Sequence, residues 1–90
     1  MKTYNACDLL VCYKEFTVFL NETKEEETIH EGEKYVVTDL ESYDNCQFYE
    51  LYNPERKLYL QLWNDRDHEF VDWHFKKIGK SYVMPKSDKI

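Results

Sequence analysis

The sequence predicts a mainly β protein built around an antiparallel meander. Three β-rich runs follow one another with short polar breaks between them, Gly32–Leu40, Gln47–Tyr52 and Leu58–Trp63. Runs of this composition, separated by turn-forming residues, are typical of neighbouring antiparallel strands. The chain has 90 residues with only two Gly and two Pro, which favours one small folded domain over a disordered segment.

The third run has the strictest alternation. Its apolar positions are Leu58, Leu60 and Leu62, and the positions between and after them are Tyr59, Gln61 and Trp63. This pattern predicts a strand with one side in the core and the other side at the surface. We therefore expect the leucines to be interior, with Tyr59 and Trp63 facing outward.

Shorter segments precede the meander. The run Leu9–Tyr13 predicts a buried first strand, and Phe16–Leu20 either continues it as one bent strand, which we favour, or forms a hairpin-like excursion. The stretch from Asn21 to Glu31 has no apolar stripe and is predicted to be a solvated acidic loop. A short helix that begins at the capping-box pattern of Thr23–Glu26 is the alternative.

Two backbone irregularities are expected within the meander. Gly32 can adopt a positive φ just before the strand begins. Leu40 lies out of phase with Tyr35 and Val37, which predicts a β-bulge near Asp39.

Composition also predicts the segments that follow the meander. We expect a charged turn at Asn64–Asp67, followed by an extended run at His68–Val71. A single 3₁₀ turn is expected at Asp72–Phe75, and the last strand at Lys76–Ile78. Gly79–Ser81 would then form a turn, and Tyr82–Met84 would return to the sheet. We expect the domain to span residues 1–84 and residues 85–90 to form a flexible tail.

Charge is distributed unevenly along the chain, whose net charge is −6. Residues 21–33 contain six Glu and one Lys, whereas residues 76–90 contain five Lys and one Asp. An acidic total argues against affinity for a phosphate backbone, and it favours a basic protein as the partner. The acidic stretch could even imitate nucleic acid on a basic surface, as a small inhibitor from a mobile genetic element would.

The remaining composition suggests an intracellular setting. The first residues lack the apolar core of a signal peptide, and no apolar run approaches the length of a membrane span. Three cysteines form an odd set, which suits reduced thiols better than a disulfide framework. We expect a cytoplasmic protein without a membrane contact, and homodimer formation is left open.

Three pieces of the sequence, in this order, resemble a small SH3-like β-barrel of the kind found in short bacterial and phage proteins. They are the strand entry Glu31–Val37, the central hairpin around Tyr49–Asn53, and the closing segment Phe70–Ile78. The resemblance implies an antiparallel barrel with a long acidic loop after its first strand and a 3₁₀ turn before its last. It also implies a binding module rather than an enzyme. It carries over no ligand, because the proline-binding aromatic set of eukaryotic SH3 domains cannot be placed residue by residue on this sequence.

Aromatic residues give the main candidate site. If Tyr59 and Trp63 face outward, Phe48 and Tyr52 on the neighbouring strand could join them, with Tyr49 as the alternative. An exposed patch rich in Tyr and Trp is typical of protein recognition. The competing interpretation is that residues 1–20 or the C-terminal segment cover this face as a second core layer.

The hypothesis for function is that Glu25, Glu26 and Glu27 steer a basic protein partner that the aromatic residues then hold. The alternative is a nucleic-acid-binding barrel that stacks bases on the aromatic face and holds phosphates with Lys76, Lys77, Lys80, Lys86 and Lys89. A third class is a small enzyme or metal protein centred on Asp65–His74, or a zinc site drawn from Cys7, Cys12, Cys46, His30, His68 and His74. The cysteine and histidine spacings do not match standard zinc motifs, and no nucleophile or glycine-rich loop is evident, so no catalytic residue, metal or cofactor is expected.

Overall fold

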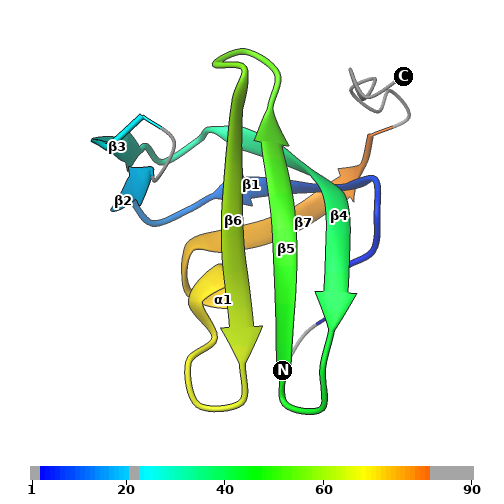
Figure 1. Cartoon of the computed structure of the whole chain (residues 1–90). Helices are drawn as coiled ribbons and strands as arrows, with labels where there is room; N and C mark the ends of the chain where they lie inside the picture. The colour runs from blue at the N-terminus through cyan, green and yellow to red at the C-terminus, as the bar shows by residue number, and fades with distance from the viewer. Residues whose placement is uncertain (1–2, 21–22, 82–90) are drawn as a thin grey trace, which may run out of the picture.

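A five-stranded antiparallel sheet and a separate two-stranded hairpin make up the fold (Figure 1). The computed structural model describes residues 3–20 and 23–81. The elements are β1 (Asp8–Cys12), β2 (Phe16–Leu20), β3 (Glu25–Ile29), β4 (Lys34–Ser42), β5 (Cys46–Asn53), β6 (Leu58–Asp65), α1 (Phe70–His74) and β7 (Phe75–Lys80). The strand order of the large sheet is β6-β5-β4-β1-β7, so the predicted meander forms one continuous half of it.

Strand β4 joins the two halves of the sheet. Its first residues pair with β1, and the stretch from Val36 to Ser42 pairs with β5. In Figure 1, β1 and β7 run across the direction of β5 and β6. The protein is mainly β, as predicted. The end strands β6 and β7 do not pair with each other, so the sheet is not closed into a barrel.

The prediction for residues 21–31 was wrong, because much of this stretch is a strand. β3 pairs with β2 along its whole length, from Phe16 opposite Ile29 to Leu20 opposite Glu25. Ile29 is fully buried in the core. Phe16, Val18 and Leu20, which alternate along β2, are partly buried and pack against the core. One buried residue at the end of β3 therefore anchors a strand that is otherwise polar.

Both backbone irregularities expected in the meander are present. Gly32 has a φ of +94°, a conformation that other residues rarely adopt. The pairing of β4 with β5 shifts by one residue between Val37 and Asp39, which leaves Thr38 as a bulge. The Thr38 hydroxyl donates to the backbone carbonyl and to the carboxylate of Glu50, at 3.1 and 2.8 Å, and so ties the bulge to β5.

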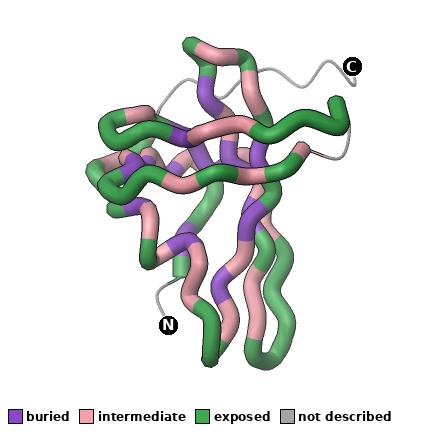
Figure 2. Tube along the Cα trace, turned by 90° about the vertical axis from the view of Figure 1, so that its left-hand side faces the viewer, coloured by how far each residue is buried: buried purple, intermediate pink, exposed green. Residues whose placement is uncertain are grey.

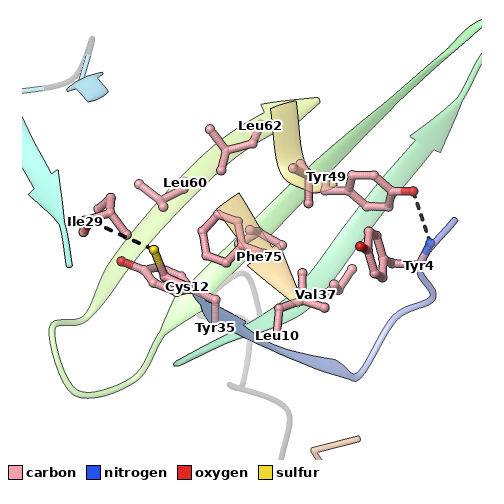
Figure 3. Close-up of a cluster of buried hydrophobic side chains, with 12 residues drawn as sticks. Tyr4, Leu10, Cys12, Ile29, Tyr35, Val37, Tyr49, Leu60, Leu62 and Phe75 are labelled. Carbon is pink, nitrogen blue, oxygen red and sulfur yellow. Dashed lines mark hydrogen bonds between the residues drawn. The ribbon is translucent and has the colours of Figure 1, made fainter. Parts of the chain in front are cut away.

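The hydrophobic core lies between the two halves of the sheet (Figure 3). Leu60 and Leu62 are 1% exposed and Leu58 is half-buried against the core, which confirms the predicted inner face of β6. Aromatic rings fill much of the remaining space, with Tyr35 against Phe75 and Tyr4 against Tyr49, each pair at 5.5 Å between ring centroids. Figure 2 shows buried residues in the middle of the strands and exposed residues at the turns.

The segment before the last strand differs from its prediction. Phe70–His74 is one turn of α-helix, with bonds from the Trp73 N–H to the Glu69 carbonyl and from the Phe75 N–H to the Val71 carbonyl, where a 3₁₀ turn was expected from Asp72. The extended run predicted at His68–Val71 is reduced to a single bridge between Asp65 and His68. No helix among the described residues is long and apolar enough to span a membrane.

Buried Asn64 of β6 explains why the chain turns helical here. Its side-chain oxygen accepts hydrogen bonds from the N–H groups of Val71 and Asp72, at 2.7 and 3.1 Å, which satisfies donors that the first turn of a helix leaves open. Its amide nitrogen donates to the Asp72 carboxylate at 3.1 Å. The last strand is longer than predicted, since β7 includes Gly79 and Lys80. The return at Tyr82–Met84 and the tail at 85–90 lie outside the described residues.

Substitution of Leu60 by Ala should lower the free energy of unfolding by about 2–5 kcal/mol, because it removes a buried side chain and leaves a cavity. Urea denaturation followed by tryptophan fluorescence measures the loss. Gln61→Ala is the matched control on the exposed side of the same strand and should change stability by less than about 0.5 kcal/mol. Equal effects of the two substitutions would contradict the assignment of the core face.

Candidate partner-binding surface

The outward side of β4, β5 and β6, called here the outer face, is organised in three cross-strand rows. The strand register places Val36, Tyr52 and Tyr59 in the first row, Asp39, Glu50 and Gln61 in the second, and Glu41, Phe48 and Trp63 in the third. Residues directly opposite on neighbouring strands share a face and lie about 5 Å apart. The structure therefore brings together all four aromatic residues that the sequence suggested, and it excludes Tyr49, which is 2% exposed on the inner side.

The aromatic residues form two pairs rather than one continuous patch. Tyr52 and Tyr59 contact each other with ring centroids 4.4 Å apart, and Phe48 lies opposite Trp63. Phe48 and Tyr59 are 48% and 47% exposed. Trp63 is more covered, because it stacks on Phe70 at 4.9 Å. The polar second row separates the two pairs.

A hollow opens on the outer face where the second and third rows meet the bulge of β4. It is lined by Asp39, Leu40, Glu41, Phe48, Tyr49, Glu50 and Gln61. The lining thus holds three carboxylates, and within the described part of the chain no Lys, Arg or His contributes to it. The hydrogen bonds that these carboxylates accept from residues 3–20 and 23–81 come from uncharged donors: Glu50 accepts from Thr38, Glu41 from the Tyr43 hydroxyl at 2.7 Å, and Asp39 from the Leu40 N–H at 2.9 Å.

The three glutamates proposed to steer a partner have different surroundings. Glu25 and Glu26 are exposed on β3. Glu27 is instead paired with Arg56 at 2.7 Å, and Arg56 also bonds the Thr28 carbonyl at 3.0 Å. Because Arg56 lies in the turn between β5 and β6, this contact places the hairpin beside the Tyr52–Tyr59 end of the outer face.

Arg56 is also the partner of Glu33, at 2.9 Å. Burial alone would raise the pKa of the Glu33 carboxyl, but hydrogen bonds from the His30 N–H, from Arg56 and from the Tyr35 hydroxyl outweigh it and lower that pKa. Burial, together with the hydrogen bond to Glu33, raises the pKa of Tyr35 despite an opposing bond with Asn53. This cluster fixes the β2–β3 hairpin to the sheet.

The titratable residues between β6 and β7 serve the local structure. The Asp72 carboxylate accepts hydrogen bonds from the Tyr4 hydroxyl at 2.5 Å and from Asn64, and His74 is bonded to the Phe70 carbonyl at 2.8 Å. His68 lies against Trp73 at 4.6 Å between ring centroids. Among residues 3–20 and 23–81, no group of three His, Cys, Asp or Glu side chains is placed to hold a metal ion.

The lysines considered for phosphate binding lie on β7, at the opposite end of the strand order from β6. Lys77 and Lys80 lie 3.4 and 4.0 Å from the buried Asp8 carboxylate. Lys76 lies over the Tyr13 ring, 5.0 Å from its centroid. Lys86 and Lys89 fall outside the described residues. The aromatic outer face and these lysines are thus carried by different parts of the sheet.

Sequence reasoning missed the acidic side of the outer face and the role of Arg56. Asp39 and Glu41 look like part of an ordinary strand end. The predicted bulge reverses the inward and outward positions that follow it, and this reversal was the one signal that could have assigned both residues to the outer face. Arg56 was considered only as a turn residue. Arg56 is followed directly by Lys57, and its partners Glu33 and Glu27 lie 23 and 29 residues earlier in the chain, so no local pattern signals these contacts.

Glu33→Gln should lower the free energy of unfolding by about 1–3 kcal/mol at pH 7, because it removes a charged partner from Arg56. The pKa of Glu33 is lower in the folded state, so the stabilisation is complete above the unfolded pKa and is lost as the pH falls through the folded value. Urea denaturation between pH 7 and pH 3 should show the two proteins converging in acid. Glu31→Gln, an exposed change nearby, is the control, and parallel curves for wild type and Glu33→Gln would contradict the assignment.

The outer face therefore combines half-exposed rings, an acidic hollow and an adjacent acidic hairpin. The nine residues of its three rows include no Cys, Ser, Thr, Lys or His, so the rows contain none of these common nucleophiles and bases. No protein-family model, curated protein or solved structure matches this chain, so a function must be argued from these surfaces.

Proposed function

We propose that this protein is a non-enzymatic binding module that docks a basic protein partner on its outer face. The observation that carries the proposal is the register of β4, β5 and β6, which presents Phe48 and Tyr59 half-exposed on the same face as three carboxylates. Exposed aromatic residues supply most of the binding energy in many interfaces, and complementary charge supplies specificity and association rate.

We further propose that the fold is a variant of the SH3-like barrel. Three features support this: the order of the five strands, the excursion after β1, and the short helix before β7. The excursion is a hairpin here, where the resemblance implied a loop. This proposal concerns architecture alone, since folds of this kind serve many functions.

The exposed glutamates of the hairpin would steer the partner toward this surface. Glu25 and Glu26 carry charge near one end of the outer face, whereas Glu27 is engaged by Arg56. A small acidic module of this kind would suit an inhibitor from a phage or another mobile element. Its target would be a host protein in the cytoplasm with a basic surface, including one that otherwise holds nucleic acid.

Nucleic-acid binding is the alternative function, and it requires the aromatic face and the lysines to act on one strand. Lys77 and Lys80 lie near Asp8, and Lys76 contacts Tyr13, so these three side chains already have partners on the other half of the sheet. A titration with labelled single-stranded DNA and RNA at low salt tests the alternative directly. Saturable binding lost on substitution of Lys76 and Lys80 would replace the proposed function.

Phe48→Ala and Tyr59→Ala should each weaken binding to a captured partner by about tenfold or more, because each removes a central apolar contact. The partner is captured with the wild-type protein from a host lysate, identified, and then titrated with each purified variant by calorimetry. Ile78→Ala is the matched control, since Ile78 is 50% exposed on β7 at the other end of the sheet. A partner that binds all three variants equally well does not use the outer face.

Glu25→Gln combined with Glu26→Gln should slow association with that partner and weaken its dependence on salt, with little change in the dissociation rate. Glu27 is left unchanged, because its loss would also disturb the contact with Arg56. Stopped-flow association rates at several salt concentrations measure the effect. Identical rates for the variant and the wild type would remove the hairpin from the mechanism.

A further inference from the structure

The hollow on the outer face has a composition that selects one kind of ligand group. Phe48, which is 48% exposed, lines the hollow together with Asp39, Glu41 and Glu50, and the remaining lining residues, Leu40, Tyr49 and Gln61, carry no charge. A cation can contact an aromatic ring face and a carboxylate at the same time, and a planar guanidinium does both better than an ammonium. Charge complementarity therefore points to arginine.

The rows on either side of the hollow indicate which side chains the partner would carry next to that arginine. Successive rows of the outer face are two residues apart along β5 and β6, which corresponds to about 7 Å. The row on one side contains the Tyr52–Tyr59 pair, and the row on the other contains Phe48 and Trp63. An extended segment lying along β5 would place alternate side chains over the three rows in turn.

We propose that the partner presents an extended segment with the pattern apolar-x-Arg-x-apolar, and that its arginine enters the hollow between Phe48 and Glu50. The inference rests on the proposed function and specifies the chemistry of the partner at the same site. Asp39 and Glu50 hold the guanidinium, and the two flanking apolar side chains contact the aromatic rows. The exposed glutamates of the hairpin act at longer range and do not contact the arginine.

Two synthetic peptides test the proposal without knowledge of the natural partner. One has the sequence Thr-Leu-Thr-Arg-Thr-Leu-Thr, and the other has neutral citrulline in place of arginine, which preserves shape and removes charge. Each is titrated into the ¹⁵N-labelled full chain and followed by chemical-shift changes. The arginine peptide should bind about tenfold more tightly, with its largest shifts at Glu41, Phe48, Glu50 and Gln61.

Two double variants with the same change in net charge locate the cation. Asp39→Asn with Glu50→Gln should abolish the preference for the arginine peptide, and both substitutions keep an oxygen that can accept the hydrogen bonds from Leu40 and Thr38. Glu31→Gln with Asp67→Asn is the control and should change the preference by less than about twofold, because these exposed carboxylates belong neither to the three rows nor to the hollow. Circular dichroism checks that both variants fold.

The outcomes separate the two proposals. Equal binding of both peptides on the outer face would overturn the arginine site and leave the docking face intact. Loss of the preference in the Glu31 and Asp67 variant, with no loss in the Asp39 and Glu50 variant, would also overturn it. An outer face that responds to neither peptide would contradict both the arginine site and the proposed function.

Discussion

One bulge in β4 decides which side of the sheet is acidic. Tyr35 and Val37 are fully buried, so uninterrupted alternation would turn Asp39 and Glu41 into the core. The unpaired Thr38 shifts the phase of the strand, which places Leu40 opposite buried Tyr49 and turns both carboxylates outward. Burial of two unpaired carboxylates would cost far more than a bulge does. The same irregularity that allows the core to form therefore also creates the acidic side of the outer face.

The distribution of charge over the surface depends on pairings that the sequence does not show. The acidic run contains glutamates that look equivalent, yet Glu27 and Glu33 converge on Arg56 whereas Glu25 and Glu26 remain exposed. Arg56 thus helps to hold the hairpin against the sheet through Glu27 and Glu33, whereas Glu25 and Glu26 leave their charges at the surface. Net charge alone predicts a basic partner, but only the fold shows which of these carboxylates are exposed and which are paired within the protein.

Local sequence patterns predicted those strands in which apolar and polar residues alternate, because this alternation itself defines the buried side of the strand. The strict period of β6 identified its buried leucines, and the phase error at Leu40 identified the bulge. β3 was missed because its stability comes from distant contacts: pairing with β2, the burial of Ile29 and the bond from Arg56 to the Thr28 carbonyl. A 3₁₀ turn was predicted where the structure has a longer segment of α-helix. The first turn of this helix donates hydrogen bonds to Asn64, a strand residue that no local helix signal includes.

Phe48, Tyr52 and Tyr59 are not part of the hydrophobic core, whereas Trp63 stacks on Phe70 at the edge of the core. Tyr4, Tyr35, Tyr49 and Phe75 already occupy the interior, and residues 3–20 pack there or in the hairpin rather than over the outer face. Two segments were considered as a cover for this face: residues 3–20 pack elsewhere, and residues 82–90 lie outside the described part of the chain. Phe48 and Tyr59 remain half-exposed although each contacts another ring, Tyr43 at 5.9 Å and Tyr52 at 4.4 Å between ring centroids. Burial of the open sides of these two rings is therefore what the proposed partner contact would add, because packing among the described residues leaves about half of each ring accessible.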